Sequence, residues 1–552
     1  MVQIRQNDAY FSPSDLKTRS DCEFRFARVV DAKLGKGNVV PEETNAMLVY
    51  SGAVGQIHEL YLVRLLREKY GVASAIGQRG VYEVAAVDYS NPDRLAALSQ
   101  AVAETRAALE AGSDVVFQAA LFDGERFGLA DFIIREGDAP DGRPLYRVVD
   151  GKMASNADKH KEYVWQLATY VEHLREMGIA VMPEARLWLG TLAYSDHNVD
   201  DVMDELHAQE GLLRAAVAAR RATSEVASWS DPVYKACGSC ASCDEQVAAA
   251  PEDLLHVYDL GGAARTKYLV AGITSMSELA ASSGGVDGIG APTAEKHRAQ
   301  AERQLRSAAT GTTVVEVINA DPIRNLPVPS DGDLYFDFET DPNDYVEGAN
   351  QLGIAYLFGI YSPLPLDAGD FGFDVKSDGT FAYLWADSRA EESVNFDLFM
   401  TYVQQRLAQH PDMHIFHYNV FEVTTLRRLV KTYGRWGDEL ESWVSHGVFV
   451  NLEPVTDKAI VTGLPSFSIK ALEGIYLADD KREGVASAGV SVQRYFEYRR
   501  ALAGTPLSAE EGGTGQSASD IKADVLQYNE RDCYSTWCLI EWLKGLLSEA
   551  HG

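Results

Sequence analysis

The first 250 residues alternate between helical and strand-like spacing of apolar side chains. Apolar residues recur every three or four positions in some segments, and alternate or form short unbroken runs in others. Two such runs flank the turn Asp123-Gly124, which predicts a β-hairpin. The predicted elements are helices over 53–70 and 92–111, hairpin strands over 114–122 and 126–134, a strand over 145–153, a helix over 158–178 and a strand over 185–192. This order predicts an α/β core.

A helical pattern follows from about 251 to 307, interrupted by the turn Gly288-Ile289-Gly290. A glycine-bearing turn between helices resembles a helix-hairpin-helix, whose exposed backbone amides can hold a phosphate. A plain helical linker capped by glycine explains the same residues equally well. Both interpretations stay open at this point.

A second α/β pattern begins near residue 314. Its predicted elements are strands over 333–340, 351–361, 381–385 and 413–418, a helix near 396–409 and a final helix containing 525–543. A chain of 552 residues exceeds what one hydrophobic core usually serves. We therefore expect three domains, over 1–250, 251–313 and 314–552.

The formal charge is strongly negative, with 50 basic and 81 acidic residues giving −31. Such a charge speaks against a nonspecific coat on nucleic acid, because backbone binding depends on cationic side chains. It leaves room for a metal-dependent enzyme, which needs clustered carboxylates. No apolar run is long enough for a bilayer span and the first residues lack a signal-peptide pattern, so we expect a cytoplasmic protein without a membrane partner.

Two carboxylates interrupt apolar strands of the first unit. Asp131 and Asp150 each stand at the end of a strand where a core residue would normally continue the run, and a buried carboxylate is costly without a partner. Lys152 follows two residues after Asp150 and so shares its strand face. Carboxylates can hold the divalent cations that phosphodiester hydrolysis needs, and an ammonium can stabilise developing charge.

The order of these residues resembles the RecB-like PD-(D/E)XK nucleases. The matching features are His58 on an early helix, G-L-A-D at 128–131, V-V-D-G-K-M-A at 148–154, and Gln166 with Tyr170 one turn apart on the next helix. The resemblance implies a restriction-endonuclease-like fold in which His58, Asp131 and Asp150 bind Mg2+ or Mn2+. It also implies that Lys152 assists catalysis with the two aspartates, and that Gln166 and Tyr170 contact DNA.

Three cysteines lie close together in the segment C-G-S-C-A-S-C, at Cys237, Cys240 and Cys243. This spacing suggests a metal site that needs a fourth ligand. Cys22, on a helix that we predict to open at Ser12-Pro13, is the remaining cysteine of this half. The arrangement resembles iron-sulfur RecB-like and CRISPR-associated nucleases, which implies a structural 4Fe-4S cluster. The last spacing is shorter than in many relatives, which leaves Zn2+ as an alternative.

A second set of acids lies in the C-terminal unit. Asp337 and Glu339 alternate with apolar residues, so both emerge on one strand face. Glu422 stands at a helix start, and Tyr528 and Asp532 lie one helical turn apart.

This set resembles the DEDD exonuclease branch of the ribonuclease H-like fold. There, four acids hold two metal ions and a tyrosine four residues before the last aspartate orients the water, which implies metal roles for Asp337, Glu339, Glu422 and Asp532 and a catalytic role for Tyr528. Glu422 departs from the usual aspartate, and the longer side chain shifts the geometry. A working exonuclease and a degenerate fold kept for positioning DNA therefore both stay open.

Taken together, these resemblances predict a metal-dependent DNA nuclease. The expected substrate is single-stranded or frayed DNA with free ends, in repair, recombination or defence. The chain has no Walker A loop, so any helicase partner would act in trans. A non-catalytic nucleic-acid adaptor and an RNA-processing 3'-5' exonuclease that uses the C-terminal unit remain as alternatives.

Overall fold

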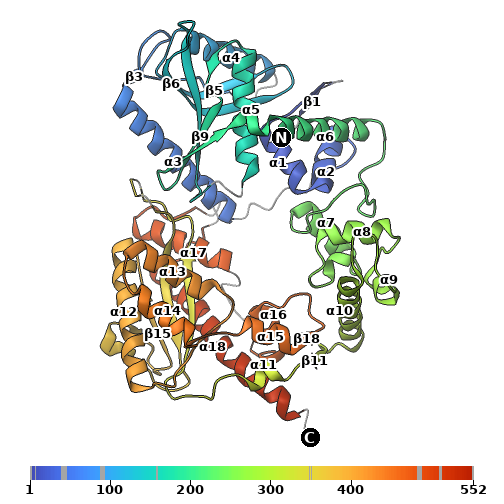
Figure 1. Ribbon diagram of the computed structural model, residues 1–552, viewed down its shortest axis with the longest axis vertical. Helices are drawn as coiled ribbons and strands as arrows, with labels where there is room; N and C mark the ends of the chain where they lie inside the picture. The colour runs from blue at the N-terminus through green and yellow to red at the C-terminus, as the bar shows by residue number, and fades with distance from the viewer. Residues whose placement is uncertain are drawn as a thin grey trace.

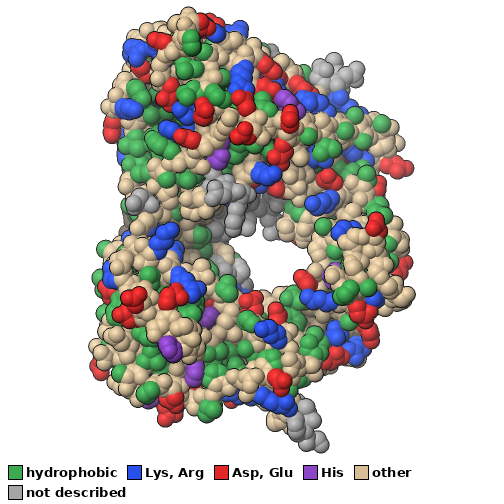
Figure 2. Space-filling model, viewed as in Figure 1, with side chains coloured by type: hydrophobic (Ala, Val, Ile, Leu, Met, Phe, Trp, Pro, Cys, Tyr) green, Lys and Arg blue, Asp and Glu red, His purple; other side chains and the backbone are tan. Residues whose placement is uncertain are grey.

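The computed structural model contains two sheet-bearing parts joined by a helical stretch. The first part lies at the top of Figure 1, the second at the lower left, and the helical stretch runs along the right side. Figure 2 shows an opening between them. The structure describes residues 3–5, 8–38, 46–87, 94–156, 160–346, 348–349, 351–480, 488–508 and 513–549.

The N-terminal part is built on a mixed sheet in the order β10-β9-β7-β6-β5-β4-β3, with β8 beside β7. Strands β5, β6 and β7 form an antiparallel meander, and β9 runs parallel to β7. The strands are β3 (Val72–Ala73), β4 (Val81–Glu83), β5 (Val115–Phe122), β6 (Phe127–Asp138), β7 (Pro144–Lys152), β8 (Ala180–Val181), β9 (Glu184–Leu189) and β10 (Tyr194–Asn198), and a separate hairpin pairs β1 (Gln3–Arg5) with β2 (Asp8–Tyr10).

Helices cover both faces of this sheet. Helix α3 (Ala46–Tyr70) packs on the face that carries Phe117, Phe132 and Val149. The opposite face, with Val116, Ile133 and Val148 among its residues, lies in the core formed with α4 (Arg94–Glu110), α5 (Lys161–Glu176) and α6 (Met203–Arg221). Alternate strand residues therefore point to opposite layers, as the pleat requires. The predicted α/β core is confirmed.

Two details of the N-terminal part differ from the prediction. Helix α1 (Pro13–Asp21) ends before Cys22, which instead caps the start of α2 (Glu23–Lys33) with its sulfur accepting from the Arg25 amide. Asp131 lies inside β6 and not at a strand end, because the hairpin strand continues to Asp138. The apolar pattern stops earlier than the strand does, since the last residues of β6 are exposed.

The joining stretch is helical, as predicted. It contains α7 (Ala241–Ala249), η2 (Leu254–His256), α8 (Gly262–Val270), α9 (Met276–Ala281) and α10 (Ala291–Thr310). Gly288 has φ of 75° and Gly290 is the N-cap of α10. The Gly288 carbonyl accepts from Lys267 Nζ at 2.8 Å, so this turn is tied to α8.

The C-terminal part has a sheet in the order β14-β15-β13-β12-β16-β17. Strand β12 is antiparallel to β13 and parallel to β16. The strands are β12 (Leu334–Asp341), β13 (Ile354–Tyr361), β14 (Asp374–Val375), β15 (Phe381–Trp385), β16 (Ile415–His417) and β17 (Phe449–Asn451), while β11 (Val315–Val317) pairs with β18 (Ile460–Thr462). The helices are α11 (Asp321–Arg324), η3 (Ala368–Phe371), α12 (Arg389–Gln409), α13 (Phe421–Tyr433), α14 (Gly437–Ser445), α15 (Glu453–Ala459), α16 (Ile469–Tyr476), α17 (Ala488–Leu502) and α18 (Ala518–Glu549).

The alternation along β12 positions the acidic residues. Leu334, Phe336 and Phe338 lie in one core cluster with α12 and α13. Tyr335 lies in the opposite cluster, which includes Leu539 of α18. Asp337 and Glu339 share the register of Tyr335 and therefore face α18. Among the described residues, no helix is long and apolar enough to cross a membrane.

Candidate metal centres

Three carboxylates converge in the C-terminal part. The ligand oxygens of Asp337 and Glu339 on β12 and Asp532 on α18 all lie within 4.8 Å of one another. Strand alternation brings out the first two on one face, and α18 packs across that face to supply the third. This geometry is able to hold a divalent cation between acidic ligands.

Burial and mutual repulsion raise the pKa values of carboxyl groups in this trio. Burial raises the pKa of Asp337 well above its usual value, and the neighbouring Asp532, Glu339 and Glu422 raise it further. Burial and Asp532 raise the pKa of Glu339 to about 8. Like-charged carboxylates in a buried site favour protonation unless a cation neutralises them. A divalent cation would supply that charge.

Glu422 lies beside this trio without joining it. It is buried at the start of α13, where its Oε2 is 3.1 Å from His417 Nδ1. Burial raises its pKa, while His417 acts in the opposite direction. Its charge is close enough to raise the pKa of Asp337, and its own oxygens are outside the closest set of three.

Two residues that the sequence did not point to, Lys470 and Asn529, contact side chains of this site. Lys470 Nζ, on α16, donates to the hydroxyl of Tyr528 and lies 4.5 Å from the centre of that ring. Asn529 Nδ2 donates to Asp337 Oδ2 at 2.8 Å. Gly359 allows this, because a Cβ there would lie 1.7 Å from Asn529 Oδ1. Helical spacing could have identified Asn529, three residues before Asp532, whereas Lys470 has no local signal.

In the N-terminal part, the structure brings together Asp131, Asp150 and Lys152. Lys152 Nζ lies 2.5 Å from Asp150 Oδ2, and the Gly151 amide donates to Asp131 Oδ2 at 2.8 Å. Burial and the carboxylate of Asp150 raise the pKa of Asp131 well above its usual value. Burial alone would lower the pKa of Lys152, but Asp150 and Asp131 raise it. The lysine therefore supplies a positive charge inside this site.

Gln166 and Tyr170 on α5 connect this site to a cavity. Gln166 Nε2 lies 3.3 Å from Asp150 Oδ1 and 2.9 Å from the Tyr170 hydroxyl. Both residues line a cavity of about 550 Å³. Gly128 is needed here, because a Cβ would lie 2.4 Å from the Tyr170 ring. Gln166 therefore lies between this cavity and Asp150.

The structure does not gather His58 with the two aspartates. The ring is buried, with Nδ1 3.2 Å from the Tyr345 hydroxyl and Nε2 3.3 Å from the Trp188 carbonyl. Burial lowers its pKa, so the ring is neutral. Its neighbour Glu59 accepts from Gln118 and also lies close enough to the site for Asp150 to raise its pKa, after the larger effect of burial.

The four predicted cysteines converge on one point. The Sγ atoms of Cys22, Cys237, Cys240 and Cys243 all lie within 4.8 Å of one another, with closest separations of 3.5 to 3.8 Å. Backbone amides donate to the sulfurs of Cys22 and Cys237, as they commonly do to metal thiolates. The set is compatible with an iron-sulfur cluster or with zinc.

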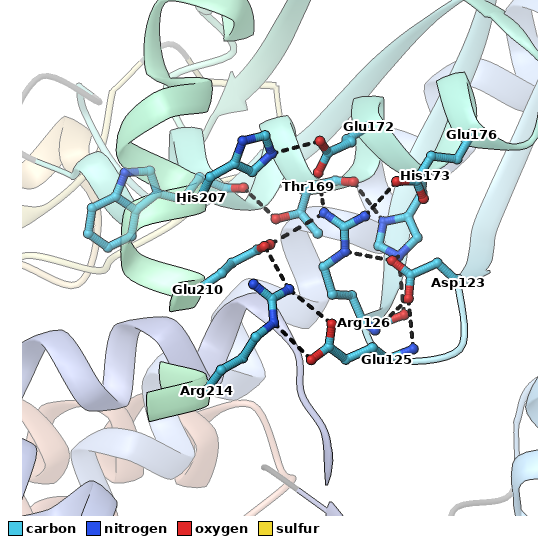
Figure 3. A network of polar contacts seen from close by, with 11 residues as sticks. Asp123, Glu125, Arg126, Thr169, Glu172, His173, Glu176, His207, Glu210 and Arg214 are labelled. Carbon is cyan, nitrogen blue, oxygen red and sulfur yellow. Dashed lines mark hydrogen bonds and ion pairs between the residues drawn. The ribbon is translucent and has the colours of Figure 1, made fainter. Parts of the chain in front are cut away.

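A third acidic cluster, drawn in Figure 3, contains its own cationic side chains, Arg126 and Arg214. The buried guanidinium of Arg126 forms ion pairs with Asp123, Glu172, Glu176 and Glu210. These contacts tie the hairpin turn to α5 and α6. Their cation is a side chain, so the cluster serves packing.

Comparison with known families identifies one region of the chain. Residues 334–544 match the family model described as the RNase_H superfamily. The C-terminal part is therefore ribonuclease H-like, as predicted, and the match points to phosphodiester hydrolysis of the metal-dependent nuclease type in general. Neither the search of curated proteins nor the search of solved structures returned a significant match.

Proposed function

We propose that the chain is a metal-dependent DNA nuclease whose main catalytic centre is formed by Asp337, Glu339 and Asp532. The observation that carries this proposal is the convergence of three carboxylates within 4.8 Å in the region that matches the RNase_H superfamily. Bound Mg2+ or Mn2+ would neutralise the scissile phosphate and lower the pKa of the attacking water. The proposed reaction is 3'-5' exonucleolytic hydrolysis.

The surrounding side chains have separate roles in this proposal. Tyr528, fixed by Lys470, orients the attacking water through its hydroxyl. Asn529 fixes the carboxylate of Asp337. Glu422, which His417 contacts, acts on the charge of Asp337 from beside the trio and is not a direct metal ligand in this proposal. A site built in this way tolerates glutamate where the family has aspartate.

The N-terminal part is proposed to be a second nuclease centre of the RecB-like PD-(D/E)XK type. Asp131, Asp150 and Lys152 supply two carboxylates and an ammonium beside a cavity lined by Gln166 and Tyr170, which suits contact with a DNA strand. His58 would complete a metal site only after its ring turns toward the aspartates.

The four cysteines are proposed to form a structural metal centre that joins Cys22 to residues 237–243. In a tetrahedral zinc site, Zn-S bonds of roughly 2.3 Å place neighbouring sulfurs about 3.8 Å apart. Four of the six Sγ–Sγ separations are 3.5 to 3.8 Å and all six are within 4.8 Å, a spacing that supports a single ion of this kind. In a 4Fe-4S cluster each thiolate binds a different iron, which needs wider spacing. Metal analysis distinguishes one zinc from four irons per chain.

Cleavage assays with single variants test the proposed function. Labelled single-stranded DNA, frayed duplex and RNA are incubated with wild type, Asp150→Ala and Asp337→Ala in Mg2+ or Mn2+. We expect 3'-5' degradation of DNA that Asp337→Ala abolishes. Degradation of RNA alone would indicate an RNA-processing exonuclease. Binding without cleavage by the wild type would indicate an adaptor and overturn the proposal. Stimulation by an added helicase would test the expected partner in trans.

A further inference from the structure

The segment 341–345 of the C-terminal part contacts helix α3 of the N-terminal part, and we call it the bridging segment. It begins at Asp341, the last residue of β12, the strand that carries Asp337 and Glu339. The Tyr50 hydroxyl of α3 donates to Asp341. The side-chain Nδ2 of Asn343 donates to Ser51 Oγ at 3.2 Å. The bridging segment therefore links the two candidate nuclease centres through a few residues.

The end of the bridging segment lies against His58. The ring of Tyr345 packs edge to face on the imidazole, with 5.2 Å between ring centres. The Trp188 carbonyl can only accept a hydrogen bond, so the neighbouring Nε2 of His58 carries the proton. The lone pair of Nδ1 is then the acceptor for the Tyr345 hydroxyl, at 3.2 Å. Both nitrogens are engaged away from the aspartates.

The carbon edge of the imidazole faces the candidate site. A Cβ added at Gly151 would lie 3.6 Å from Asp131 Oδ2 and 3.9 Å from His58 Cδ2. Nδ1 lies across the ring from Cδ2, so it points away from this side. A turn of the ring about its Cβ-Cγ bond would bring Nδ1 toward Asp131, and that turn breaks the contact with Tyr345.

We propose that Tyr345 holds the N-terminal centre in a state of low metal affinity, because its hydroxyl occupies the nitrogen lone pair of His58 that a divalent cation needs. The inference rests on the proposed function of His58, Asp131 and Asp150 as a metal site. Release of the bridging segment frees the imidazole to turn and complete the ligand set. The C-terminal part thereby regulates the N-terminal centre.

Calorimetric titration of Mn2+ into the full chain tests this regulation. Asp337→Asn and Asp532→Asn are included in every protein, so that the signal removed by Asp150→Ala belongs to the N-terminal centre. Tyr345→Phe keeps the ring and removes the hydroxyl. We expect it to lower the Mn2+ Kd by about five- to tenfold, the equivalent of one hydrogen bond. His58→Ala should cancel this gain.

Tyr61→Phe is the matched control. Its ring lies 6.4 Å from that of Tyr345 in the same cluster, but its hydroxyl does not reach the imidazole nitrogens, and we expect an unchanged Kd. If Tyr345→Phe binds Mn2+ through Asp150 no more tightly than the protein that keeps Tyr345, the inference is wrong, while the proposed metal site is still supported. If Asp150→Ala removes no Mn2+ binding either from the protein that keeps Tyr345 or from Tyr345→Phe, both the proposed metal site and the inference are wrong.

Discussion

The two candidate nuclease centres both contain buried carboxylates, but only in the C-terminal centre do all three closest candidate ligands already lie together. In the C-terminal part, Asp337, Glu339 and Asp532 already lie within 4.8 Å of one another. In the N-terminal part, Lys152 contacts Asp150 at 2.5 Å, while His58 turns its nitrogens to other partners. The first arrangement needs a cation from solution, and the second has part of that charge built in.

The Arg126 cluster completes this comparison. Four of its carboxylates pair with the guanidinium of Arg126, and Arg214 also pairs with Glu210, so each of these four has a cationic side-chain partner. A buried acidic group lacking such a side chain raises its own pKa values, as Asp337 and Glu339 show. The source of the positive charge therefore distinguishes the trio from the Arg126 cluster: a cation from solution would balance the trio, whereas arginine side chains lie within the cluster.

Loss of one carboxylate from the trio should have the largest effect. Asp337→Asn keeps the shape of the side chain and removes a charged ligand. In an Asp150→Ala background, we expect it to reduce Mn2+-dependent hydrolysis by about 10³-fold, equivalent to roughly 4 kcal/mol. Glu541→Gln, which changes an exposed carboxylate on α18, the helix that carries Asp532, should leave the rate unchanged. Because Asp150 is already absent, cleavage retained in Asp337→Asn would show that hydrolysis does not require the C-terminal trio, which contradicts its assignment as the main catalytic centre.

The four-cysteine centre should contribute mainly to stability. Cys22→Ser removes a ligand that closes a loop between residues 22 and 237. We expect lower metal content and a Tm reduced by about 5 to 10 °C for the N-terminal transition, measured by scanning calorimetry. Cys538→Ser, outside the four-cysteine set, is the control. An unchanged Tm together with full metal loss would show that the centre is not a structural staple.

The raised pKa of Glu339 predicts a pH dependence that the Arg126 cluster lacks. In metal-free protein, the folded state binds this proton up to about pH 8, whereas the unfolded chain releases it near 4.5. Stability should therefore fall as pH rises between these values, because the native state binds more protons there. We expect Tm in a chelator to fall by a few degrees over this window, roughly 3 to 6 °C. Glu339→Gln should flatten the slope, and an identical slope would argue against a buried, unneutralised carboxylate.

The smallest expected effect is at Glu422. Because Glu422 contacts His417 and lies outside the closest set of three, Glu422→Gln should reduce the rate by about tenfold, far less than Asp337→Asn. The measurement is the Mn2+-dependent hydrolysis rate in the same Asp150→Ala background. Equal losses for both variants would place Glu422 among the direct ligands.

Local periodicity accounts for the residues that could be predicted from the sequence. Alternation along one strand placed Asp337 and Glu339 on a common face, and the helical repeat placed Tyr528 next to Asp532. The predicted ribonuclease H-like domain is confirmed by the family match. These features need only neighbouring residues on one element.

The remaining features depend on distant partners. Lys470 reaches Tyr528 across 58 positions of the chain, and Tyr345 reaches His58 across 287. No local pattern encodes such contacts, because they arise only when separate elements pack together. The orientation of His58 is the clearest case, since its motif matches a metal ligand while its hydrogen bonds direct both nitrogens elsewhere.

Anomalous scattering from crystals soaked in Mn2+ would show directly whether the three carboxylates bind a metal ion. We expect an anomalous peak within bonding distance of the carboxylate oxygens of Asp337, Glu339 and Asp532, and no peak at the Arg126 cluster. Absence of a peak at these three carboxylates under saturating Mn2+ would contradict the assignment of the C-terminal centre.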